Sequence, residues 1–442
     1  MKAIDAFIES ACLSLGSEQQ GIRDLDSKQI ELAWISADDS LHLASVLGHA
    51  GAIRAALNND PSAANKKGGP HQWDPLTYLC FSYFIRQPLE KADVLASAEL
   101  LLQAGANPNT GFFNTQHSPE SIFESVLYGA AGIAHHEDLT RLLLKHGADP
   151  NDGETPYHVP EGYDNGAFRA VFESGKLNDS GMATLLLRKI DFHDGAAIDW
   201  LLKRGLDPNL KGVWGKTVLQ SAIVRGNDLS IIQCLLEYGA NPNTPGKEGN
   251  AHTLAARYGR GDALKVFDPM KAEAGLSPVD QLLAACASGN RTELKSLARK
   301  YPEAIADVKS QSGFILTEYS GRGNKEGLSL LIELGCDINS RHGLGDGYYD
   351  ITKDSTPLHA AAWRAQHDTV SFLIERGADV QLLDGKGRSA LGLAVEASVH
   401  SYWTELRSPQ SVAALIQAGA TRQGVRFPCG YEKIDTLLAA MG

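Results

Sequence analysis

The chain has 442 residues, of which 43% are hydrophobic and 21% charged, a balance that indicates a soluble folded protein rather than a disordered one. Its formal net charge of -12 argues against a nucleic-acid-binding protein, because phosphate neutralisation needs a basic face. No apolar run is long enough to predict a membrane span. The six cysteines are scattered without paired spacing, which predicts reduced thiols and a cytoplasmic location. Asp5 and Glu9 interrupt the first apolar stretch, so we expect no signal peptide there.

A nine-residue phrase recurs along the chain and marks the ends of repeated units. Its clearest copies are LLQAGANPN at 101, LLKHGADPN at 143, LLKRGLDPN at 201 and LLEYGANPN at 235. A second phrase precedes it and is fullest in STPLHAAAWRAQHDTVSFLIERGADV, residues 355–380. There Thr356 is a helix cap, Pro357 suits the first helical turn, and Gly377 ends a second helix. Such a pair of short helices must stack on its copies to bury its apolar side chains.

These two phrases, recurring in this order, resemble the ankyrin-repeat family, in particular bacterial-type multi-repeat members. The resemblance implies an all-α solenoid of about eleven helix-pair repeats with finger loops along one edge and a concave face lined by first helices. Its expected parts are N-terminal capping helices (1–38), the solenoid (39–420) and a C-terminal capping helix (421–442). We place repeat ends near 60, 105, 147, 175, 205, 239, 271, 301, 335, 377 and 419, with the weakest matches at 271 and 301.

The repeat at 153–178 departs from this pattern. It begins as a helix with Thr155 as its cap, but Pro160 follows within two turns. Proline lacks an amide proton and clashes with the preceding turn, so we expect the first helix of this repeat to be cut to about one turn. In the next repeat Lys189 stands where the family's small alanine pair belongs. We therefore expect Lys189 to project into the space that the short helix leaves.

These irregularities predict a polar-aromatic pocket at repeats three to five. The residues expected around Lys189 are Tyr128, Tyr157, His158, Glu161, Tyr163, Phe192 and Asp194. If the pocket is catalytic, Lys189 binds an anionic or carbonyl group, His158 or His193 moves a proton, and Asp191 orients His193. Two alternatives stay open: a decayed repeat without a pocket, and a structural role in which His158 braces neighbouring turns.

Aromatic residues in the expected fingers are further candidates for binding. Trp73 and Trp214 are either walls for a ligand or partner, or they pack on the neighbouring finger. Tyr349, Trp363 and Arg364 form a second group in repeat ten, of residue types that are enriched in interface hot spots. Here too the alternative is packing of the group on its own finger.

Other motifs indicate no metal or cofactor. His135 and His136 fall on a turn, where adjacent rings cannot easily share an ion, and no third ligand has suitable spacing. The glycine-rich GRGNKEG at 321–327 belongs to a turn between helices, so we expect no phosphate-binding loop there. The sequence therefore predicts a binding protein whose protein partner it does not name. The alternative is an enzyme or small-molecule binder whose pocket takes a polar or anionic ligand.

Overall fold

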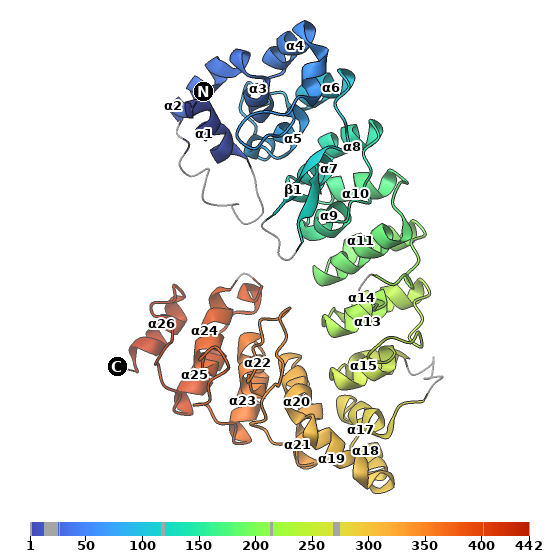
Figure 1. Ribbon diagram of the computed structural model, residues 1–442. Helices are drawn as coiled ribbons and strands as arrows, with labels where there is room; N and C mark the ends of the chain where they lie inside the picture. The colour runs from blue at the N-terminus through green and yellow to red at the C-terminus, as the bar shows by residue number, and fades with distance from the viewer. Residues whose placement is uncertain are drawn as a thin grey trace. The chain divides into compact units, whose positions relative to one another are not determined.

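The computed structural model describes residues 2–12, 25, 27–115, 120–212, 215–267, 275–400 and 402–441. The chain divides into two compact units, Met1–Trp214 and Gly215–Gly442, and both are built from short helices (Figure 1). None of the helices in these residues is long and apolar enough to cross a membrane. All six cysteines are free thiols.

In the residues that the structure describes, eleven helix pairs follow one another within the two units, in agreement with the predicted ankyrin-repeat fold class. The first helices of the pairs are α3 (Leu41–Leu47), α5 (Pro75–Cys80), α7 (Val126–Tyr128), α9 (Glu154–His158), α11 (Asp179–Asp191), α13 (Val218–Val224), α15 (Ala251–Arg257), α17 (Pro278–Ala287), α20 (Ser312–Gly321), α22 (Pro357–Trp363) and α24 (Ala390–Val399). The second helices are α4 (Ala50–Asn59), α6 (Val94–Gln103), α8 (Glu137–Lys145), α10 (Gly166–Glu173), α12 (Gly195–Lys203), α14 (Leu229–Glu237), α16 (Gly261–Phe267), α18 (Arg291–Lys300), α21 (Lys325–Glu333), α23 (His367–Glu375) and α25 (Gln410–Gln417). The other helices are α1 (Lys2–Ala11), α2 (Ser27–Ile35), α19 (Pro302–Ser310) and α26 (Glu432–Ala439).

The recurring phrases form the predicted caps. Thr356 and His359 make a reciprocal capping box at the start of α22, with Pro357 in the first turn. The glycine at the fifth position of the nine-residue phrase has φ between 87° and 101° at positions 105, 147, 205, 239, 335, 377 and 419. A residue with a side chain is strained in that conformation, which explains why glycine recurs there.

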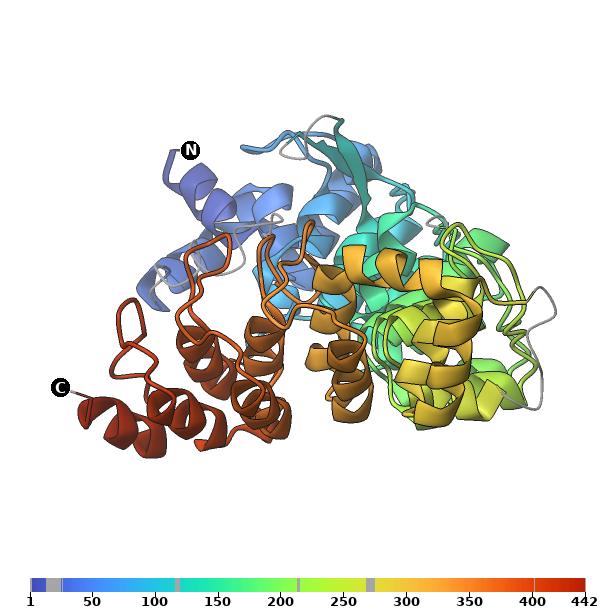
Figure 2. The ribbon, with the colours of Figure 1, turned by 90° about the horizontal axis from the view of Figure 1, so that it is seen from below.

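Finger loops connect one pair to the next. In the second unit the loops before α22 and α24 lie side by side (Figure 2), joined by a 2.9 Å hydrogen bond from the Gly385 amide to the Lys353 carbonyl. In the third repeat the finger is a two-stranded antiparallel hairpin, β1 (Gly111–Asn114) and β2 (Ile122–Ser125). Phe112 pairs with Glu124 in this hairpin.

One finger is replaced by a helix. The repeat end expected at 301 has no glycine, and Pro302 instead begins α19, because proline is favoured in a first helical turn. The repeat end expected near 271 lies outside the described residues.

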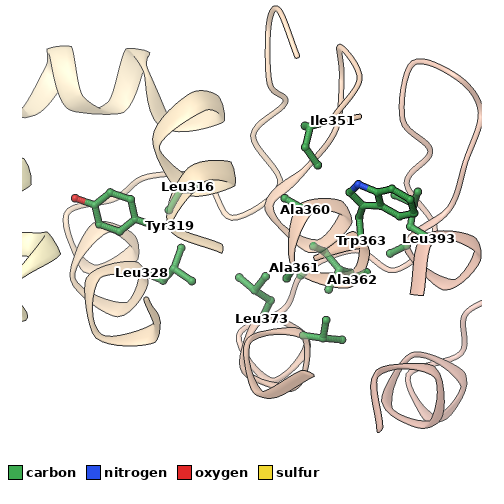
Figure 3. Close-up of a cluster of buried hydrophobic side chains, with 14 of the residues drawn as sticks. Leu316, Tyr319, Leu328, Ile351, Ala360, Ala361, Ala362, Trp363, Leu373 and Leu393 are labelled. Carbon is green, nitrogen blue, oxygen red and sulfur yellow. The ribbon is translucent and has the colours of Figure 1, made fainter. Parts of the chain in front are cut away.

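Small side chains allow the first helices of the second unit to pack closely. Ala360, Ala361 and Ala362 of α22 are at most 1% exposed and lie among larger apolar side chains such as Leu373 (Figure 3). Tyr319 of α20 is fully buried in the same core. Its hydroxyl donates to the carbonyl oxygens of Ala256 at 2.7 Å and Leu283 at 3.0 Å, and so connects three successive first helices.

We expect Tyr319→Phe to destabilise the second unit by about 1–2 kcal/mol, because it removes a buried donor from two carbonyl acceptors. Urea unfolding of the full chain, followed by circular dichroism, measures this change. Tyr402→Phe is the matched control, since Tyr402 is 74% exposed. Equal midpoints for the Tyr319 variant and wild type would contradict the role given to this hydroxyl.

Candidate functional site

The residues of the predicted pocket lie around the shortened first helix of repeat four. The helix α9 has five residues, and a 3₁₀ turn containing Pro160 follows it. Its start is capped by Asp152, whose Oδ1 accepts from the Thr155 amide at 2.7 Å, and not by Thr155 as the sequence suggested. The last carbonyls of a helix have no intrahelical donor. A helix this short therefore presents acceptors to its neighbour.

Lys189 extends from α11 towards the end of the 3₁₀ turn that follows α9. Its side chain is fully buried, and Nζ donates to the Gly162 carbonyl at 2.9 Å and to Asp194 Oδ2 at 3.0 Å. Nζ also lies 4.9 Å from the ring centre of Phe168. Burial lowers the pKa of Lys189, while the bond to Asp194 opposes that shift. Asp194 in turn caps α12 by accepting from the Ala197 amide at 3.0 Å, so the ion pair ties α11 to α12.

Arg188, which the sequence analysis did not select, is the centre of a second network. Its Nε donates to the Tyr157 carbonyl at 3.1 Å, Nη1 to Asp191 Oδ2 at 2.8 Å, and Nη2 to Glu161 Oε1 at 2.8 Å. The guanidinium also lies 4.1 Å from the ring centre of Tyr157. Arg188 therefore compensates a carbonyl at the end of the shortened helix, where cations are favoured by the helix dipole.

His158 lies between two carboxylates. Its Nδ1 is 2.9 Å from Glu161 Oε1 and its Nε2 is 3.3 Å from Glu154 Oε2. Burial opposes the charge on the ring, but the hydrogen bonds to Glu154 and Glu161 outweigh burial and raise the pKa of His158 to about 9. The imidazole is therefore a cation at neutral pH, paired on both sides. The spacings of Glu154, His158 and Glu161 place them on one side of a helical turn, a signal present in the sequence.

The remaining candidates of repeat five lie at the end of α11 and on the turn after it. His193 is exposed and has φ of 54°. Asp191 binds Arg188, and Phe192 packs with its ring centre 5.2 Å from the same guanidinium. Tyr163 is 73% exposed, and its hydroxyl donates to the Phe192 carbonyl at 3.0 Å.

The aromatic candidates of repeats two and three are in the interior of the first unit. Tyr128 is 1% exposed, with its ring centre 5.2 Å from that of His158. Gly132 makes room for this ring, since an added Cβ would lie 2.6 Å from a Tyr128 carbon. Trp73 is 8% exposed, and its ring stacks on that of Phe112 in the hairpin with the ring centres 4.3 Å apart. This is the alternative in which Trp73 packs on the neighbouring finger. Trp214 lies outside the described residues.

The repeat-ten group is also packed on its own finger. Trp363 is 6% exposed, and its Nε1 donates to the Tyr349 carbonyl. The Tyr349 hydroxyl donates to the carbonyl of Arg225, and the Arg364 guanidinium lies 3.8 Å from the Tyr349 ring centre. The finger thus reaches back to the turn after α13 within the second unit.

Exposed apolar side chains remain on two fingers of this unit. Leu344 is 92% exposed, Leu383 49% and Tyr348 36%, and we call these three residues the finger surface. Salt bridges hold the two fingers together: Asp350 of one accepts from Lys386 at 2.8 Å and from Arg388 at 2.7 Å of the other. The finger surface is therefore presented by a cross-linked scaffold.

Comparison with known proteins finds the ankyrin repeat in two segments. The family model described as "Ankyrin repeat" matches residues 214–247 and 353–385. Human Rabankyrin-5 is 35% identical over 77 residues, which are 17% of this chain, and mouse Rabankyrin-5 is 35% identical over 86 residues, or 19%. Each match spans only 7% of the relative's length. Both relatives are mammalian and lend no support to the expected bacterial-type relationship.

Two solved structures are similar to parts of the chain. The ankyrin repeat domain of human ASB11 is 21% identical, with a TM-score of 0.25, over 53% of this chain and 98% of that domain. The ankyrin repeat domain of Bcl-3 is 21% identical, with a TM-score of 0.24, over 52% of this chain and 97% of that domain.

We expect Lys189→Met to destabilise the first unit by about 3 kcal/mol, because Asp194 is left buried without its cation. Adding Asp194→Asn should recover part of this loss, since asparagine still caps α12 and carries no charge. Urea unfolding measures both changes. Lys203→Met is the control, because the salt bridge between Lys203 and Asp199 is exposed and should contribute less than about 1 kcal/mol to stability. If the Lys189→Met variant were as stable as the wild type, the ion pair between Lys189 and Asp194 would contribute nothing to stability.

The pKa of about 9 for His158 predicts how stability depends on pH. It exceeds the unfolded value of roughly 6.5, so the stabilisation is complete below that pH and is lost as the pH rises through 9. We expect the stability difference between wild type and His158→Gln to be about 2 kcal/mol larger at pH 6 than at pH 10. Thermal unfolding at both pH values tests this, with His193→Gln as the exposed control. If the stability difference between wild type and His158→Gln did not depend on pH, His158 would be neutral in the folded protein.

Proposed function

This chain is an ankyrin-repeat protein, and we propose that it binds a protein partner through the finger surface of its second unit. Ankyrin repeats generally mediate protein–protein interactions. The proposal rests on the finger surface itself. Large apolar side chains are exposed there on loops that salt bridges hold together. Apolar anchors on a preorganised surface lose little conformational entropy on binding.

The cross-links between the fingers support this role. The Arg388 guanidinium donates to Asp350 on one finger and to Asp384 on its own at 2.8 Å. Arg341 Nη1 donates to the Leu383 carbonyl at 3.0 Å, so the backbone that carries Leu383 is fixed from the neighbouring finger. The backbone that presents Leu383 is therefore held in place before a partner arrives.

The face formed by the first helices, where we expected a concave groove, is proposed as a second contact region. A cytoplasmic location stays part of the proposal and is supported by the scattered free cysteines.

The alternative function, catalysis or small-molecule binding at repeats three to five, also stays a prediction. Less supports it, because Lys189 already donates to Gly162 and Asp194 inside the protein.

Affinity purification from the source cells, with wild-type protein and a Leu344→Asp/Leu383→Asp variant as baits, tests the proposal. We expect the wild type to retain a protein that the variant loses. Direct titration of this partner should show an affinity for the variant at least about thirtyfold weaker than for the wild type. Both changes are on exposed side chains, so the variant should unfold at the wild-type urea midpoint.

Leu406→Asp is the matched control, because Leu406 is 52% exposed but lies between α24 and α25 rather than on a finger. A partner lost equally by this control would indicate a general effect of the added charge. A partner retained by the finger variant would place its binding site elsewhere on the chain.

A further inference from the structure

The second unit contains a polar cavity of about 540 Å³ that the sequence analysis did not identify. The turns between first and second helices of five consecutive repeats line it, from the pairs α13/α14 to α22/α23. These helices follow one another around a bend (Figure 1). Arg322 Nη2 donates to the Val224 carbonyl at 2.6 Å across that bend. All lining residues lie between Gly226 and Gln366, within one unit.

Three buried arginines meet in this cavity with unused donors. Arg260 is 6% exposed, Arg364 8%, and the side chain of Arg322 5%. Among the described residues no acceptor lies within hydrogen-bond distance of Arg260 Nη1, Arg322 Nε or Arg364 Nε. A buried donor without an acceptor costs about 1–3 kcal/mol. These three nitrogens are enclosed by the protein, so a group bound in the cavity would contact the Nη atoms of Arg364, for which the described residues supply no hydrogen-bond acceptor.

The charges of two of these arginines are locally balanced. Arg260 donates to both carboxylate oxygens of Asp262, at 2.9 and 2.7 Å, and Arg322 pairs with the buried Glu318. Arg364 forms no ion pair in the described part of the chain, and its charge lies over the ring of Tyr349. Burial and the nearby Arg322 lower the pKa of Arg364, while Tyr349 and Glu318 oppose this. The cavity thus holds one guanidinium without a carboxylate partner.

Two glycines leave space for this cation. A Cβ at Gly321 would lie 2.9 Å from Arg364 Cδ, and one at Gly226 would lie 3.3 Å from Arg364 Nη2. Gly226 also has φ of 63°, a conformation that other residues rarely adopt. The turns of repeats six and nine are therefore shaped around Arg364.

We propose that this cavity binds a phosphorylated, hydroxylated small molecule of the sugar phosphate class, with Arg260, Arg322 and Arg364 around the phosphate. A planar guanidinium matches the oxygens of a phosphate and forms two parallel hydrogen bonds with it. The phosphate group would accept from the Arg364 guanidinium and offset its charge. The volume falls in the range of small-molecule sites, about 300–1,000 Å³, and exceeds what a phosphate ion alone would fill.

The rest of the lining fits hydroxyl groups. It supplies carboxylates from Asp228, Asp262 and Glu326 and the side-chain amide of Gln366, which accept from and donate to hydroxyls. None of the lining residues is aromatic, so a nucleotide base would find no ring to stack on. The glycine-rich stretch at 321–327 takes part through the side chain of Arg322 and remains a turn between helices. No residue of the finger surface lines this cavity, and either site could exist without the other.

The test is binding of glucose 6-phosphate, inorganic phosphate and glucose to the full chain, by calorimetry and thermal shift at matched ionic strength. We expect glucose 6-phosphate to bind saturably and raise the Tm, inorganic phosphate to bind more weakly, and glucose to have no effect. Arg364→Ala should weaken the affinity for glucose 6-phosphate by at least about tenfold. Arg376→Ala, which removes an exposed arginine of the same unit, should leave binding unchanged.

Because Arg364 packs on Tyr349, a second variant protects the test against misfolding. Ser288→Glu places a negative charge at a partly exposed position of the cavity lining and should abolish binding without removing a core contact. No saturable binding of either phosphate compound would overturn the proposal, as would binding that persists in both variants. Equal affinities for inorganic phosphate and glucose 6-phosphate would overturn the sugar part of it.

Discussion

No helix pair of this protein can bury its apolar side chains alone, and this constraint governs both units. Each first helix must lie close to the next, which requires small residues such as Ala360–Ala362 at the contact and larger ones such as Leu373 around it. Each second helix must end sharply so that a finger can begin, which requires a glycine in the left-handed region. The same stacking brings the turns of successive repeats together, and turn residues then become neighbours although they are far apart in the sequence.

The two polar clusters illustrate opposite outcomes of that stacking. In the first unit, Arg188 donates to a carbonyl of the shortened helix α9 and Lys189 to the Gly162 carbonyl after it. Asp191, Asp194 and Glu161 balance their charges. Every nitrogen of Arg188 donates within the protein. In the second unit, Arg364 is equally buried but has no carboxylate partner among the described residues. A satisfied buried network stabilises a fold, whereas an unsatisfied one indicates a missing ligand.

The fingers add a third use of the same architecture. Where a finger packs inwards, as Trp73 does on Phe112, its aromatic side chain is part of the core. Where two fingers are tied by Asp350, Lys386 and Arg388, the apolar side chains at their tips point to solvent. Residue type alone does not distinguish these cases. Trp363, predicted beside Arg364 as a partner contact, is 6% exposed, whereas Leu344, which no motif marked, is 92% exposed.

The sequence by itself determined the repeated helix pair, most of the repeat ends and the shortening of α9 by Pro160. These features depend on caps, glycines and prolines, whose effects act within a few residues of the chain. Only the tertiary structure decided which polar side chains meet. Arg188 reaches Glu161 across 27 positions and Arg322 reaches Val224 across 98, and no local pattern encodes such separations. Long side chains can extend in several directions, so whether Lys189 or Arg364 finds a partner depends on how neighbouring repeats pack around it.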